Sequence, residues 1–310
     1  MTKCLLTYET IDEGNYSSTA LKRLARGLTN IREIPLDTAG LRQEAAARAD
    51  KMSIQGVQTK LSALLSVKDQ EFKLVDREGR FILKPQSDRY AHLPENEDLT
   101  MHLAALVGIE VPAHGLVKAR DGSLVYFIKR FDRSGQKDRI ATEDFGQVLG
   151  LSRETKYESS LEKLVTVLDQ HCTFPALERK KLFERTVFNY LVGNEDMHLK
   201  NFSLITQVNI IRLAPAYDFL NSSIVLRDPE ELALPLKGKK RGVTRKLLVH
   251  YFAKERLRLN EKTIQIVLDS FEQMIPTWND WIAKSFLPIE LKMKYLELVK
   301  HRLGVLGLEQ

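Results

Sequence analysis

The residues with the clearest capacity for chemistry lie close together in the second half of the chain. The segment 193–201 reads Gly-Asn-Glu-Asp-Met-His-Leu-Lys-Asn, which places Asp196 and Asn201 five positions apart. Asp218 follows after two short apolar segments that predict a pair of strands. Phosphoryl transfer needs a carboxylate that orients the attacking hydroxyl and oxygen ligands for Mg²⁺, and these three side chains can supply both.

The spacing favours this chemistry over a purely structural interpretation. Asp and Asn often do no more than cap helices and turns. Protein kinases, however, carry an Asp, an Asn five residues later and a second Asp beyond a short hairpin. Here Asp196 and Asn201 lie between a predicted helix end and a predicted hairpin, and Asp218 is followed by Phe219. The pattern therefore indicates a kinase.

The first half of the chain contains the other parts that a kinase requires. These are a strand lysine that holds the phosphates of ATP, an acid that fixes this lysine, and a loop over the nucleotide. Lys84 ends an apolar run and precedes a predicted helix with Glu95 and Glu97. The segment 53–60 lies ahead of these strands, although with one glycine it is a weak signal by itself. The segment 129–133 falls where a hinge between two lobes is expected.

The elements around these residues can be read from the apolar pattern. Residues 72–75 and 80–83 flank a four-residue turn that ends in Gly, which predicts a β-hairpin. Apolar residues at helical spacing predict a helix from 94 to 107. A second turn, at 121–122, precedes a nearly continuous apolar run over 124–128 that is typical of a buried strand.

Beyond residue 133 the pattern becomes mostly helical. Helices are predicted over 161–168, 182–191, 261–275 and 290–303, and short strands over 202–205 and 210–213. We therefore expect an α+β chain with a two-lobe, protein-kinase-like fold. Residues 1–130 would form the strand-rich N-terminal lobe, and residues 131–310 the helical C-terminal lobe.

The composition agrees with a two-lobe protein. The 310 residues are too many for one small core, and 43% hydrophobic with 28% charged residues argues against wholesale disorder. Apolar runs stay far below the roughly 18 residues of a membrane span, and no signal peptide is visible. Two cysteines cannot form a disulfide framework. The expectation is a cytoplasmic protein without a membrane segment.

The formal net charge of +6 is a local feature of the chain. The segment 237–258 holds nine basic residues against one acid, so the remaining chain has a net charge of about −2. This basic segment is either a solvated surface or a surface that binds nucleic acid, in which case its affinity would depend steeply on salt.

Taken together, the ordered motifs resemble the HipA-type serine/threonine kinases of bacterial toxin–antitoxin systems. The motifs are Ser53 to Lys60, Phe81-Ile82-Leu83-Lys84-Pro85, Glu95-Asn96-Glu97, Arg130-Phe131-Asp132-Arg133, residues 193–201 and Ala216-Tyr217-Asp218-Phe219. The resemblance runs from about residue 50 to the C-terminus. It is strongest to the short form, HipT, whose missing N-terminal subdomain is carried by a separate small protein.

The resemblance implies a role for each matching residue. Asp196 would be the catalytic base, Asn201 and Asp218 the Mg²⁺ ligands, Lys84 the lysine that holds the phosphates, and His198 a neighbour of the phosphates. Lys129, Arg130 and Phe131 would frame the adenine of ATP. Gln55 and Gly56 would belong to the loop over the nucleotide, and Ser53 matches the serine that family members autophosphorylate. HipT relatives often read Ser-Ile-Ser here, whereas this chain has Gln55 in place of the second serine.

The implied function is that of an ATP- and Mg²⁺-dependent serine/threonine kinase toxin. Such a protein would inhibit translation by phosphorylating an aminoacyl-tRNA synthetase. A small HipS-like protein and a DNA-binding HipB-like protein would restrain it.

Two other functions stay open at this point. The Asp-x-His-x-x-Asn loop also resembles phosphoinositide kinases, so a lipid or small-molecule kinase is an alternative. The second alternative is a nucleic-acid-binding module on a degenerate kinase fold, with direct contacts from residues 237–258.

Overall fold

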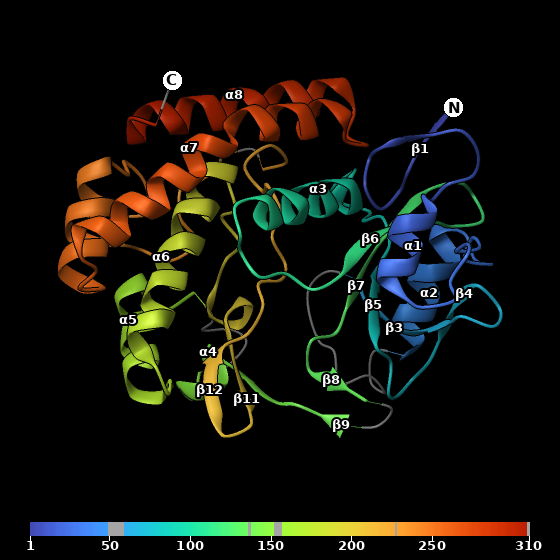
Figure 1. The fold of residues 1–310 in the computed structure, drawn as a ribbon, viewed down its shortest axis with the longest axis horizontal. Coiled ribbons are helices and arrows are strands. Elements are labelled where there is room, and N and C mark those ends of the chain that lie inside the picture. The colour runs from blue at the N-terminus through green and yellow to red at the C-terminus, as the bar shows by residue number, and fades with distance from the viewer. Residues whose placement is uncertain (49–58, 136–137, 152–156, 227, 309–310) are drawn as a thin grey trace. The chain divides into compact units, whose positions relative to one another are not determined.

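A computed structural model gives the fold of the chain (Figure 1). It describes residues 1–48, 59–135, 138–151, 157–226 and 228–308. The chain divides into two compact units. The N-terminal unit comprises Met1–Leu99, Pro112–Lys137 and Lys284–Leu287, and the C-terminal unit comprises Thr100–Val111, Asp138–Ala283 and Pro288–Gln310.

A five-stranded antiparallel sheet forms the core of the N-terminal unit (Figure 1). Its strands, in spatial order, are β4 (Glu71–Leu74), β3 (Leu61–Ser66), β5 (Phe81–Lys84), β7 (Leu124–Lys129) and β6 (His114–Lys118). The rings of Phe72, Phe81 and Phe127 pack against one another with centroid separations of 5.0 to 6.0 Å. This aromatic cluster buries apolar area from three of the strands and stabilises the sheet.

One predicted pairing in this sheet is wrong. The turn at 76–79 predicts that β4 and β5 form a hairpin, whereas both strands pair with β3. The chain is tied to β3 on both sides of the turn, because the amides of Val75 and Arg80 donate to β3 carbonyls. Gly79 permits this path, since a Cβ there would lie 1.9 Å from the Oγ of Ser62. The turn predicted at 121–122 and the buried strand after it are confirmed, and the turn joins β6 to its antiparallel partner β7.

Short elements complete the N-terminal unit. They are β1 (Thr2–Lys3), β2 (Thr10–Ile11), α1 (Ser18–Leu24), α2 (Thr38–Arg48) and β8 (Arg133–Ser134). Ser17 caps α1 by accepting a hydrogen bond from the amide of Ala20, and α2 contacts β3. The predicted helix after β5 is confirmed as α3 (Leu93–Leu106), whose residues from Thr100 onward belong to the C-terminal unit.

The C-terminal unit is mainly helical. Its helices are α4 (Phe145–Val148), α5 (Leu161–His171), α6 (Pro175–Val192), the π-helix η2 (Lys246–Arg256), α7 (Glu261–Lys284, of which all but Lys284 lies in this unit) and α8 (Ile289–Leu306). The central helix α6 contacts α5, α8 and η2. Helix α7 continues beyond its predicted end through Pro276, because its apolar face with Phe271, Trp278 and Ile282 is buried.

A three-stranded sheet accompanies these helices. Its order is β10 (Ala141–Asp144), β11 (Ser203–Gln207) and β12 (Ile210–Leu213), and all pairs are antiparallel. The hairpin of β11 and β12 confirms the two strands predicted from the sequence. The short strand β9 (Asp138–Arg139) and the 3-10 turn η1 (Leu199–Asn201) are the remaining elements of this unit. Among the described residues, none of the helices is long and apolar enough to cross a bilayer.

Gly193 ends α6 at the start of the loop that contains Asp196. Its φ of +73° lies in the left-handed region, where L side chains are strained. A Cβ at this position would lie 2.5 Å from Leu298, 2.8 Å from Asn221 and 2.8 Å from Ser223. The position therefore requires glycine both for its backbone conformation and for its packing.

We expect Gly193→Ala to lower the melting temperature by about 5 to 10 °C, because overpacking of roughly 1–3 kcal/mol adds to the cost of the left-handed backbone. Gly242→Ala is the matched control, since Gly242 has a φ of +70° and a Cβ added there would have nothing within 4 Å. Thermal unfolding of both variants measures the difference. Equal losses would contradict a packing role for Gly193.

Candidate active site

Lys84 is buried at the end of β5 and forms an ion pair. Its Nζ contacts Oε1 of Glu97 on α3, and both side chains are 2% exposed. The ring of Tyr126 lies beneath the same ammonium, with 5.6 Å between Nζ and the ring centroid. A buried ammonium needs such a partner, because removing it from water is costly. The predicted lysine and one of the two predicted acids therefore meet inside the N-terminal unit.

Glu95, the other predicted acid, has different partners. Its carboxylate accepts a hydrogen bond of 2.9 Å from Nε2 of Gln86 and lies 3.2 Å from Nδ1 of His92. These contacts connect the first turn of α3 to the chain that leads into it from β5. The structure thus distinguishes the two acids, which sequence reasoning left equivalent.

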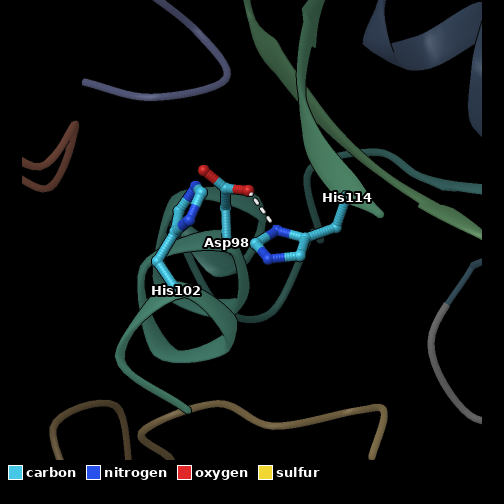
Figure 2. A group of neighbouring side chains, drawn as sticks. All are labelled: Asp98, His102 and His114. Carbon is cyan, nitrogen blue, oxygen red and sulfur yellow. Dashed lines mark hydrogen bonds and ion pairs between the residues drawn. The ribbon is translucent and has the colours of Figure 1, made fainter. Parts of the chain in front are cut away.

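Asp98 anchors α3 to the sheet (Figure 2). One oxygen of its buried carboxylate lies 2.9 Å from Nδ1 of His114 at the start of β6, and the other accepts a hydrogen bond of 2.7 Å from the hydroxyl of Tyr8. Burial raises the pKa of Tyr8, and the neighbouring Asp98 raises it further. His102 lies one turn further along α3 (Figure 2). Because hydrogen bonds engage both oxygens of Asp98, we interpret the group as an anchor of the helix that carries Glu97.

The predicted hinge residues lie at and just beyond the end of β7. Lys129 is the last residue of the strand and its side chain is exposed, and the backbone amide of Arg130 donates to the carbonyl of Arg80. The guanidinium of Arg130 binds both carboxylate oxygens of Asp132, at 2.9 and 2.7 Å. Burial would raise the pKa of Asp132, but the hydrogen bonds and charges of Arg130 and Arg133 lower it overall.

Phe131 follows directly and has a partly exposed side chain. The Arg130–Asp132 pair fixes the chain on both sides of it. The side chain of Arg130 is therefore engaged within this segment.

The loop after α6 folds around the backbone carbonyl of Asp196. This carbonyl accepts a hydrogen bond of 2.8 Å from the amide of His198 and one of 2.9 Å from Nδ2 of Asn201. The amide of Asp196 donates to Oδ1 of Asn194 at 3.2 Å. The side chain of Asp196 is 50% exposed, and its Oδ1 lies 4.0 Å from Nε2 of the buried His198. Asp196 thus has a fixed backbone and an accessible carboxylate.

The β11–β12 hairpin brings Asp218 back towards Asn201. Tyr217 makes the connection, because its hydroxyl donates to the carbonyl of Lys200 at 3.0 Å and lies 2.6 Å from Oγ of Ser203. Asp218 directly follows Tyr217, and Asn201 directly follows Lys200. The bond between Tyr217 and Lys200 therefore holds Asp218 and Asn201 at the same end of the hairpin. Asp218 has a φ of +57°, which is uncommon outside glycine and often found at functional sites. Burial raises the pKa of Tyr217, so it acts as a neutral hydroxyl.

A buried arginine on α8 binds the last turn of α6 and the chain that packs beside the loop. The guanidinium of Arg302 donates to the carbonyl of Tyr190 and lies 3.4 Å from Oγ of Ser223 and 3.5 Å from the carbonyl of Glu230. Glu195, beside Asp196, accepts hydrogen bonds from Ser223 and from the amide of Glu230. Sequence reasoning missed these residues, because a single Arg on a predicted helix gives no sign of a distant partner.

Some predicted site residues cannot be placed. Ser53, Gln55 and Gly56 lie outside the residues that the structure describes. The basic segment 237–258 forms a loop and η2, and acids of the same unit pair with several of its cations. The pairs are Lys240 with Glu230, Arg241 with Asp228, and Lys254 with Glu261. Lys239 and Arg258 have exposed side chains.

Comparison with known protein families identifies the family of this chain. Residues 52–278 match the HipA-like C-terminal domain family. The chain belongs to this family. The match covers both the strand with Lys84 and the loop with Asp196.

Named relatives agree with this assignment. A Haemophilus influenzae protein provisionally named a kinase is 33% identical over 205 residues, which cover 62% of this chain and 59% of that protein. The Shewanella oneidensis serine/threonine-protein kinase toxin HipA is 28% identical over 207 residues, which cover 60% of this chain and 47% of that protein. Across the curated relatives the match spans 43% to 64% of their length.

Solved structures show the same fold. The Shewanella oneidensis HipA of a complex with HipB and operator DNA matches with a TM-score of 0.69 at 22% identity, covering 88% of this chain and 72% of that chain. The Helicobacter pylori kinase CtkA matches with a TM-score of 0.56 at 15% identity, covering 82% and 92%. The HipA-like chain therefore has the expected two-lobe, kinase-like α+β fold.

The bracing carboxylate of Glu195 gives a pH prediction. Burial raises its pKa above the ordinary 4.5, although the hydrogen bonds from Ser223 and Glu230 act in the opposite direction. The folded state thus holds this proton more tightly than the unfolded chain. We expect the free energy of unfolding of the wild type, relative to Glu195→Gln, to fall as pH rises from below 4.5 through the folded pKa. Urea unfolding over a pH series measures this difference, and parallel profiles would contradict it.

Proposed function

We propose that this protein is an ATP- and Mg²⁺-dependent protein kinase. The observation that carries the proposal is the gathering of Asp196, Asn201 and Asp218 at one end of the β11–β12 hairpin. The buried pair of Lys84 and Glu97 supports it, since kinases use such a pair to hold phosphate oxygens. The HipA-like family and the kinase names of the relatives point to the same activity.

The donor atoms fit the proposed metal. Asn201 and Asp218 offer a carboxamide and a carboxylate, which are the hard oxygen ligands that Mg²⁺ prefers. The Nδ2 of Asn201 is bound to the carbonyl of Asp196, so the amide oxygen is the atom for a cation. When bound, Mg²⁺ and ATP supply the charge neutralisation and the phosphoryl group of the reaction.

The side chains of the protein would then orient the reacting groups. Asp196 would accept the proton of the attacking hydroxyl, for which its exposed carboxylate is suited. Lys84 would hold phosphate oxygens, with Glu97 keeping its ammonium in place. His198 would donate towards the phosphates from its buried position beside Asp196. Lys129, Arg130 and Phe131 would frame the adenine.

The substrate specificity, subtype and autophosphorylation that we propose are taken from the HipA-like family. We infer a serine/threonine specificity and the short HipT form, with autophosphorylation at Ser53 in a nucleotide loop that includes Gln55 and Gly56. Residues 1–130 and 131–310 would act as the two lobes. The Shewanella oneidensis relative is named a toxin, and its solved form is a complex with HipB and operator DNA.

By analogy, we propose a cytoplasmic toxin that phosphorylates an aminoacyl-tRNA synthetase. A HipS-like small protein and a HipB-like DNA-binding protein would restrain it. Mass spectrometry of phosphosites after incubation with ATP, Mg²⁺ and a bacterial lysate tests the substrate and Ser53 together. A phosphorylated lipid or metabolite, without any phosphoprotein, would favour a lipid or small-molecule kinase instead.

The central test is Asp196→Asn, which keeps the shape of the side chain and removes its basicity. We expect a loss of phosphotransfer of at least about 100-fold, because the acceptor hydroxyl loses its base and its orientation. Asp269→Asn on α7 is the control, since it makes the same change at a carboxylate outside the proposed site, one that accepts a hydrogen bond from Gln265. Transfer of labelled phosphate from ATP measures both variants. Retained activity in Asp196→Asn would overturn the proposal.

A further inference from the structure

Tyr157 contacts the proposed catalytic base. Its hydroxyl donates a hydrogen bond to Oδ1 of Asp196. The residue lies four positions before α5 and is 38% exposed, so it reaches the loop from the surface of the C-terminal unit. Nothing in the sequence motifs pointed to this tyrosine.

The ring of Tyr157 is held as well as its hydroxyl. The imidazole of His198 lies edge-on to it, with 5.1 Å between the ring centroids and 85° between the planes. The ammonium of Lys240 lies over the ring at 5.7 Å from the centroid, within the range of a cation–π contact. Lys240 also pairs with Glu230 at 3.0 Å. Three groups therefore fix the position of this phenol.

The hydrogen bond from Tyr157 to Asp196 is the same bond that the hydroxyl of a phosphoryl acceptor must form. In phosphoryl transfer, the attacking hydroxyl forms a hydrogen bond to the catalytic carboxylate and transfers its proton to it. The hydroxyl of Tyr157 already donates to that carboxylate. A substrate serine or threonine must therefore displace the phenol, or compete with it for Asp196.

We propose that Tyr157 is a specificity-determining residue that occupies the acceptor position at Oδ1 of Asp196 and keeps water from this one oxygen. This inference rests on the proposed kinase function and deepens it. A phenol is a more acidic hydrogen-bond donor than water, so its hydroxyl competes well with a single water for a carboxylate oxygen. A protein acceptor can offset the lost contacts with its own, because it buries further surface around the site. Tyr157 would thus favour protein acceptors over hydrolysis of ATP.

The experiment compares Tyr157→Phe with Tyr251→Phe. Tyr251 is a matched control: its hydroxyl lies 3.0 Å from Oε1 of Glu162 and its ring contacts the ammonium of Lys237 at 4.8 Å. Release of inorganic phosphate from ATP, without added protein acceptor, measures transfer to water. We expect Tyr157→Phe to raise this rate about five-fold, because Oδ1 of Asp196 loses the phenol hydroxyl and becomes free to accept from water. Tyr251→Phe leaves the rate at the wild-type value.

Binding of a fluorescent ATP analogue is measured in parallel and should be equal in all three proteins. An unchanged or lower rate of phosphate release in Tyr157→Phe, with binding intact, overturns the inference. A lower rate would make Tyr157 a positioning residue for Asp196. Phosphate found on Tyr157 itself also overturns the inference, since the tyrosine would then be an acceptor.

A second measurement does not depend on activity. The melting temperatures of Tyr157→Phe, Asp196→Asn and the double variant form a cycle. If the hydroxyl and the carboxylate bind each other, the losses of the single variants are not additive, and additive losses contradict the contact. Absence of phosphate transfer to water or to any protein acceptor in both the wild type and Tyr157→Phe, together with a non-additive cycle, would instead overturn the proposed kinase function and leave the Tyr157–Asp196 bond established.

Discussion

The N-terminal unit depends on the buried ion pair between Lys84 and Glu97. Two charges withdrawn from water are tolerated only when they satisfy each other, and removing one partner typically costs about 3–5 kcal/mol. This constraint fixes the position of α3 against β5. Asp98, the next residue, ties the same helix to β6 through His114 and to Tyr8. The neighbouring carboxylates of Glu97 and Asp98 thus hold one turn of α3 against β5 and β6.

The C-terminal unit has a different constraint, because the loop that contains Asp196 is polar and mostly lacks the hydrogen bonds of a regular helix or strand. Asp196 lies in a loop that is held near both of its ends, because the carbonyl of Gly193 accepts hydrogen bonds from Ser222 and Ser223 and the carbonyl of Lys200 accepts one from Tyr217. These bonds satisfy backbone carbonyls of the loop, which mostly lacks a regular element to do so. The carboxylate of Asp196 is thereby kept accessible while its backbone is fixed.

The sequence predicted local elements well and distant contacts poorly. Apolar spacing located α3, α5, α6 and the β11–β12 hairpin, because these patterns arise within one element. The pairing of β4 with β3 was missed, since a turn signal does not say which strand the chain joins next. Motif spacing gave Lys84, Asp196, Asn201 and Asp218 as predicted site residues, but it could not point to Tyr217 or Arg302 as their structural neighbours. Those residues act through partners that are far away in sequence, 17 residues in one case and 112 in the other.

The basic segment shows how charge in a sequence and charge in a structure differ. Residues 237–258 carry nine cations, yet Lys240 pairs with Glu230 and lies over the ring of Tyr157, and Arg241 pairs with Asp228. The amide of Glu230 in turn donates to Glu195, next to Asp196. Part of the segment is therefore built into the surroundings of the proposed base. An anionic partner that withdrew Lys240 would remove both its contact with the ring of Tyr157 and its pair with Glu230.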